Sequence, residues 1–124
     1  MVKSPRWIRP HTITVINALP ESAAGEEQTS TAELRHVKVE ARRKAVYGTT
    51  GRSFTDTVTV VIDANDIEAD KALVDPSEFT DPESQFTLRV GDRIRFNDQE
   101  MEISGVNRVN PLRSAPEFIE VSAS

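Results

Sequence analysis

Apolar and polar residues alternate with a period of two along most of the chain, and the spacing of a helix is nearly absent. The first alternating stretch is residues 11–17, where Ile13 and Val15 alternate with Thr12, Thr14 and Ile16. It begins directly after Pro10, a position at which the missing backbone N–H does least harm to a strand. The pattern therefore predicts a first strand at residues 11–17.

Two longer alternating stretches lie at residues 33–46 and 54–63. In the first, the face that alternates with the apolar residues is charged, and in the second it carries threonines. One apolar and one polar face is typical of an antiparallel sheet with one side in water. Residues 47–52, which contain two glycines, connect the stretches, so the sequence predicts a long hairpin with its tip there.

Shorter strands follow in the second half of the chain. Residues 93–96 and 99–103 alternate on either side of Asn97 and Asp98, a turn-forming pair that predicts another hairpin. Gly105 predicts a bulge, and residues 118–121 a final strand. About six short strands in hairpins predict a mostly β protein, a small antiparallel β-barrel or sandwich with long polar loops, and a single domain over residues 1–124.

The alternation also predicts which residues form the core and which do not. The expected core is Val37, Val39, Val58, Val60, Ile62, Leu88, Ile94, Phe96, Met101, Ile103 and Ile119. Residues 20–32 and 64–84 are polar, with few core candidates, so we expect poorly ordered loops there. Within residues 64–84, we expect at most a single helical turn, at residues 68–73.

Composition excludes several kinds of chemistry. The chain has no cysteine, which rules out disulfides, thiolate metal sites and a cysteine nucleophile. Two histidines cannot hold a metal without carboxylates or a second subunit, so we expect no metal and no cofactor. Apolar runs are far shorter than the roughly 20 residues that cross a bilayer, and no secretion signal is expected.

Candidate sites for binding or catalysis are few. Residues 63–66 open like a calcium loop, but Ile67 stands where an oxygen ligand is needed and Glu68 where the sharp turn needs glycine. We expect a solvated acidic loop instead. His36 is expected at the surface, and His11 is expected to hydrogen-bond to backbone. No nucleophile elbow or acid–base pair is recognisable, so we expect no catalytic residue and no enzyme.

Charge is distributed unevenly along a chain whose net charge is −5. Residues 35–52 hold six cations and one acid, whereas residues 63–83 hold eight acids and one lysine. The cations near the hairpin tip predict contact with DNA phosphates or with an acidic protein surface, or else a charged edge that blocks strand pairing. They are Arg42, Arg43, Lys44 and Arg52. The acids expected to contact a neighbouring copy are Asp63, Asp66, Glu68 and Asp70.

Four stretches together resemble a known family. They are residues 10–15 (PHTITV), 56–62 (DTVTVVI), 90–103 (VGDRIRFNDQEMEI) and 118–121 (FIEV). In this order they resemble the small neck proteins of long-tailed bacteriophages, the head-closure (stopper) or head–tail connector proteins, also called minor capsid proteins. Asp98 stands where the family pattern suggests glycine, a departure that concerns only the turn type.

The resemblance implies a role and a set of partners. It implies a β-barrel protein that is made in the host cytoplasm and assembles in the virion neck as a ring of twelve copies. The ring would lie below the portal and its adaptor, retain the packaged double-stranded DNA and dock the tail. The resemblance implies no catalytic residue, no cofactor and no membrane partner.

The residues by themselves also leave two alternative functions open, besides the less supported possibility of an enzyme. A tail-terminator or tail-completion protein would bind the tail tube rather than the portal side. A stand-alone small β-barrel binding module would recognise nucleic acid or a protein ligand. An enzyme is the third and least supported class.

Overall fold

Nine strands account for most of the protein in a computed structural model, which describes residues 5–20, 25–48, 51–109 and 117–124, and their side chains except those of 42–56 and 109. The strands are β1 (His11–Leu19), β2 (Gln28–Gly48), β3 (Gly51–Asp63), β4 (Glu68–Ala69), β5 (Ala72–Leu73), β6 (Gln85–Phe86), β7 (Arg93–Phe96), β8 (Gln99–Val109) and β9 (Phe118–Ala123). Two short 3₁₀ helices, η1 (Arg6–Ile8) and η2 (Pro76–Glu78), complete the elements.

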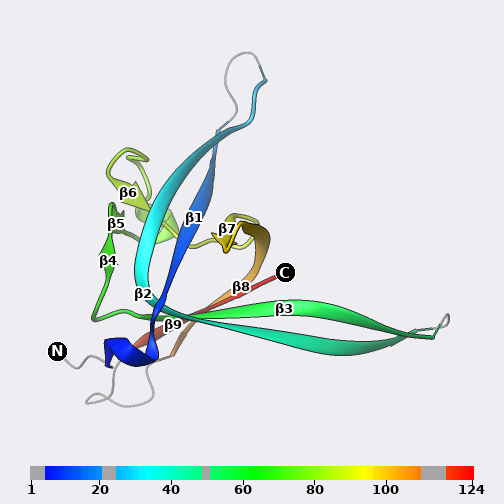
Figure 1. Ribbon diagram of the computed structural model, residues 1–124. Helices are drawn as coiled ribbons and strands as arrows, with labels where there is room; N and C mark the ends of the chain where they lie inside the picture. Colours follow the sequence, from blue (N-terminus) through cyan, green and yellow to red (C-terminus); the bar gives the residue numbers. More distant parts are fainter. Residues whose placement is uncertain (1–4, 21–24, 49–50, 110–116) are drawn as a thin grey trace.

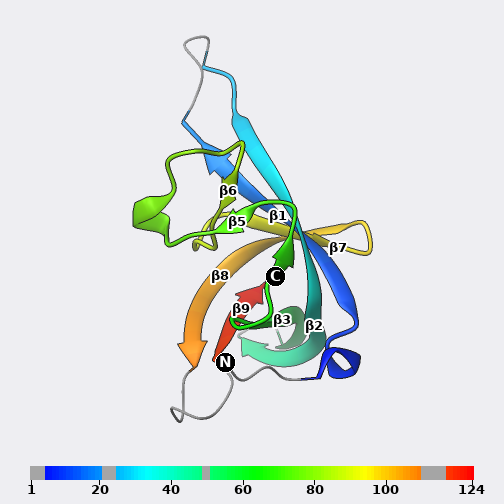
Figure 2. The ribbon, with the colours of Figure 1, turned by 90° about the vertical axis from the view of Figure 1, so that its left-hand side faces the viewer.

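Six of the strands close into an antiparallel barrel. Their order is β1-β7-β8-β9-β3-β2, and β2 pairs back onto β1, so the sheet returns to its first strand (Figure 1 and Figure 2). Closure leaves no free edge within the barrel itself that could pair with other chains. The predicted mostly β fold, a small antiparallel barrel, is confirmed.

The core fills the barrel with residues from all six strands. Of the predicted core, seven residues are buried, namely Val37, Val60, Ile62, Leu88, Ile94, Ile103 and Ile119. Val39, Val58, Phe96 and Met101 pack against the core but are only partly buried. The prediction missed other buried residues, among them Ile13, Val15, Leu34, Phe86 and Val121.

A bulge in β2 explains why simple alternation failed there. Leu34 and Val37 are both buried although three positions separate them. The register against β1 shifts between His11 and Ile13, and His36 has a φ of 57°. One extra residue in a strand reverses the facing of the residues beyond it. Both halves of β2 therefore direct apolar residues into one core.

The two segments predicted to be poorly ordered are largely structured. Residues 28–32 belong to β2, so that part of the prediction is wrong; residues 21–24 lie outside the described residues. The helical turn expected at residues 68–73 is also wrong. Glu68 and Ala69 pair with β2 as β4, and β5 pairs with β6. Backbone partners on β2 and β6 decided these short strands, and the local composition gave no sign of them.

Candidate assembly surfaces

The β2–β3 hairpin extends beyond the barrel as a two-stranded ribbon (Figure 1). β9 pairs with β3 only from Val58 onwards, and β1 pairs with β2 only up to Val37. Residues 42–48 and 51–57 thus pair with one another and, within the described strands, with no third strand. Such a ribbon presents backbone N–H and C=O groups along both outer edges.

The predicted hairpin with its basic tip is confirmed at the level of the backbone. Arg42, Arg43 and Lys44 lie on β2 in register with residues 57, 56 and 55, and Arg52 pairs with Tyr47 near the tip. The side chains of these four cations lie outside the described residues. Their contact with DNA or with a neighbouring copy stays a prediction.

At the other end of β3, a buried arginine joins three segments of the chain. Arg9 is 1 % exposed. Its Nη2 atom lies 2.8 Å from Oδ2 of Asp66 and 3.8 Å from Oδ2 of Asp63, and its Nη1 donates to the carbonyl oxygen of His36 at 2.6 Å. This guanidinium therefore fixes the β2 bulge and the turn after β3 to the segment that leads into β1. No pattern along the chain predicts this burial, because arginine is rarely fully buried.

Asp66 also binds a second arginine. Nε and Nη2 of Arg6 each donate to one of its carboxylate oxygens, both at 2.9 Å. Hydrogen bonds from Arg6 and then Arg9 hold the pKa of Asp66 well below its usual range, against the effect of burial. The same bond with Asp66 raises the pKa of Arg6.

These contacts correct the acidic part of the predicted site. Asp63 and Asp66 are buried and bind arginines of their own chain, so they form neither a solvated loop nor a surface for a neighbour. Glu68 is half-exposed, and its Oε2 lies 2.6 Å from Nε2 of His36, which is itself partly buried. Asp70 is exposed and accepts the N–H of Glu33 at 2.9 Å. Glu68 and Asp70 alone of the four remain accessible at the surface.

The other histidine has the backbone contact that we predicted. Nδ1 of His11 accepts the N–H of Val39 at 3.0 Å, and its ring packs edge-on against Phe96 with centroids 5.2 Å apart. This side chain therefore satisfies a backbone group beside the bulge.

A second buried polar network secures the turn before β7. Asn17 donates to the carbonyl oxygen of Thr87 at 2.7 Å and to Oδ2 of Asp92 at 2.9 Å, and its own oxygen accepts the N–H of Thr87. Arg89 donates to the same Asp92 oxygen at 2.8 Å. Asp92, which directly precedes the predicted hairpin, is thus a structural residue that ties the turn to β1.

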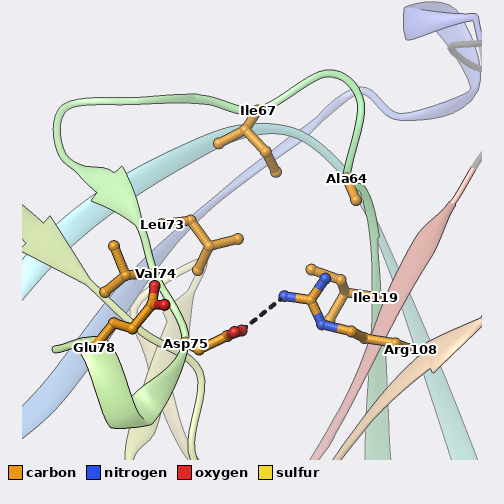
Figure 3. A pocket seen from close by; sticks show the side chains of 8 residues that line it. All are labelled: Ala64, Ile67, Leu73, Val74, Asp75, Glu78, Arg108 and Ile119. Atoms are coloured by element: carbon orange, nitrogen blue, oxygen red, sulfur yellow. Dashed lines mark hydrogen bonds and ion pairs between the residues drawn. The ribbon is translucent and has the colours of Figure 1, made fainter. Parts of the chain in front are cut away.

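A crevice of about 350 Å³ lies between the segment after β3 and the β8–β9 hairpin (Figure 3). Its apolar walls are formed by Ala64, Ile67, Leu73, Val74 and Ile119. Arg108 crosses its mouth, with its guanidinium 3.2 Å from Asp75 and 3.2 Å from Glu117. A smaller hollow of about 60 Å³ shares several of these walls and reaches Thr87, whose buried hydroxyl has no hydrogen-bond partner in the structure.

Within the described part of the chain, no three His, Asp or Glu side chains gather where they could hold a metal ion. Among the same residues, no helix is both long and apolar enough to cross a membrane.

The fold defines the class of this protein: a closed six-stranded antiparallel β-barrel from which a two-stranded ribbon projects. The chain belongs to the family of unknown function DUF6751, whose model matches residues 8–122. No curated protein matches the chain.

Proposed function

We propose that this protein is a structural neck component of a long-tailed bacteriophage, a head–tail connector of the head-closure type. It assembles as a ring below the portal and its adaptor, closes the DNA-filled head and docks the tail. The proposal rests on the sequence resemblance and is supported by one feature of the fold above all, the β2–β3 ribbon.

The ribbon supports an assembly role because a two-stranded hairpin on its own is expected to need a partner. A two-stranded hairpin without a third strand or a packed face is marginally stable in water. This ribbon continues for seven paired positions past the last residue of β3 that β9 covers, from Arg42–Thr57 to Gly48–Gly51. A neighbouring subunit that paired with one of its edges would supply the missing strand, as in recognition by β-strand addition. Twelve such contacts between identical copies would close a ring.

The basic composition of the ribbon suits a channel that DNA must cross. Four cations in residues 42–52 meet phosphates without reading bases, and their attraction weakens as salt rises. A ring that retains DNA and later releases it needs contacts of this weak, sequence-independent kind.

Deletion of the gene from a phage that carries it tests the proposal. We expect full-length tails and DNA-filled heads that do not join, with heads that lose their DNA, and restoration of infectious particles by the wild-type chain supplied in trans. Tails of irregular length on otherwise intact heads would instead indicate a tail terminator. Particles with normal infectivity and normal DNA retention would contradict a neck role.

A further inference from the structure

Trp7 is the most exposed of the large apolar side chains in the described residues, at 80 %. It lies on η1 between Arg6 and Arg9, and both of these arginines bind the carboxylate of Asp66. The segment that carries Trp7 is therefore fastened to the barrel on both sides of the exposed residue. Because this backbone is already fixed, binding through Trp7 orders little more than its side chain, and tryptophan is one of the residues enriched at the centres of protein interfaces.

The crevice beside β8 and β9 has the size and character to receive such a side chain. Its volume of about 350 Å³ is within the range of roughly 300–1,000 Å³ typical of binding pockets. The walls are aliphatic, and Figure 3 shows the side chains of Ile67, Leu73 and Ile119 directed into the space. The lining carries two carboxylates, Asp75 and Glu78, against the single guanidinium of Arg108, which also pairs with Glu117 beside the crevice, so the rim is acidic overall.

Trp7 cannot be the occupant of its own crevice in this structure. It is not among the residues that line the crevice, and η1 lies beyond the turn that carries Ala64 and Ile67 (Figure 3). Its neighbours along the chain include Lys3 and Arg6, and Arg6 is about half-exposed. The tryptophan segment is thus basic and the crevice rim acidic, and the two lie at different places on one molecule.

We propose that Trp7 of one copy inserts into the crevice of a second copy. This inference rests on the self-association within the proposed function and names a residue pair that joins neighbouring subunits. Because the two surfaces differ, the contact is head-to-tail, the kind that forms rings or filaments rather than closed dimers. A tryptophan buries roughly 150–250 Å², so Trp7 is the anchor of a larger interface that includes other contacts.

The chain offers a direct probe, because Trp7 is its only tryptophan. We expect its fluorescence emission to move to shorter wavelength as the concentration rises, in step with the increase in mass seen by sedimentation velocity. Trp7→Ala should weaken self-association on the order of 30-fold or more, the effect of losing an interface hot spot. A red emission maximum that persists in assembled protein would overturn the proposal.

Matched variants separate the crevice from general effects of charge. Val74→Glu places a carboxylate on the crevice wall and should weaken assembly as strongly as Trp7→Ala. Val90→Glu makes the same chemical change at a valine that is 66 % exposed and does not line the crevice, and it should leave assembly unchanged. Circular dichroism and thermal melting verify that each variant is folded. Loss of assembly in Val74→Glu with none in Trp7→Ala would mean that another segment fills the crevice, and would overturn the role of Trp7.

Cross-linking tests the head-to-tail direction, and the absence of native cysteine makes it clean. A variant with Ile8→Cys beside Trp7 and Glu78→Cys at the crevice rim should give a ladder of covalent oligomers with a short bismaleimide. Trp7→Ala added to that variant should remove the ladder. Cross-linked dimers without larger species, or monomers up to about 1 mM, overturn the proposal. A ladder from a protein whose gene deletion leaves phage normal would instead refute the neck role and keep this contact.

Discussion

Arg9 and Asp66 form an ion pair that is withdrawn from water, with Nη2 of the arginine 2.8 Å from Oδ2 of the aspartate and both side chains at most 5 % exposed. The pair joins residues 57 positions apart in the chain. Because Arg9 also binds Asp63 and the carbonyl oxygen of His36, the pair holds the start of β1, the β2 bulge and the turn after β3 together. The stability of this end of the barrel thus depends on ion pairs as well as on apolar packing.

Arg9→Ala should lower the free energy of unfolding by about 3–5 kcal/mol, because it leaves buried carboxylates with one cation fewer. Urea denaturation followed by circular dichroism measures the change. The matched control is Arg95→Ala, at an exposed arginine on β7, which should change the stability by no more than about 0.5 kcal/mol. Equal changes in the free energy of unfolding for the two variants would show that the buried ion pair stabilises the protein no more than an exposed arginine does.

Stability should fall in acid through Asp66. Folding lowers the pKa of this carboxyl, so its contribution is present above the unfolded-state pKa of about 4 and is lost as the pH falls towards the folded-state value. The thermal midpoint should therefore decrease between about pH 4 and pH 2. Asp66→Asn should be less stable at neutral pH and less sensitive to acid. The same acid dependence in Asp66→Asn and in the wild type would assign the effect to other carboxylates.

The bulge at His36 should reject β-branched residues. With φ at 57°, the backbone lies in the left-handed region that asparagine tolerates and valine does not. His36→Val should therefore be less stable than His36→Asn by about 1–3 kcal/mol, although both lose the imidazole contact with Glu68. Chemical denaturation of the two variants side by side measures the difference, and equal stabilities would contradict the bulge geometry.

Two phenylalanines should differ in their cost of truncation. Phe86 is 1 % exposed in the core, so Phe86→Ala should cost about 3–5 kcal/mol. Phe96, the residue that the alternation pattern nominates for the core, is only partly buried against His11, so Phe96→Ala should cost less, about 1–2 kcal/mol. The two denaturation midpoints compare these directly, and a larger loss at Phe96 would contradict the burial of the two side chains.

The cations of the ribbon should matter in the particle and not in the isolated domain. A virion carrying Arg42→Ser, Arg43→Ser, Lys44→Ser and Arg52→Ser should leak DNA or fail to join tails, while the purified protein keeps its melting temperature. Acids at these four positions combined with Asp70→Lys and Glu83→Lys should rescue the particle only if the ribbon contacts a neighbour's acidic segment, since both acids are exposed and neither lines the crevice. Normal DNA retention and tail joining in the four-serine virion would leave the ribbon as a charged edge.

The sequence by itself determined the fold class and the positions of the main hairpins. Alternation with a period of two is a local property of strands, so Val58, Val60 and Ile62 identified β3, and Asn97 with Asp98 identified the β7–β8 turn. Closure of the barrel was not determined in this way, because the pairing of β2 with both β1 and β3 follows from the bulge at His36 and from the long reach of β2.

Only the tertiary structure decided which charged residues face water. In the sequence, Asp63 and Asp66 look like the other acids of residues 63–83, and Arg6 and Arg9 like an ordinary basic N-terminus. Folding brings these four together because a buried carboxylate needs a cationic partner, and the partner came from more than fifty positions away. A pattern read along the chain records neighbours in sequence, whereas the free energy of burying a charge depends on neighbours in space.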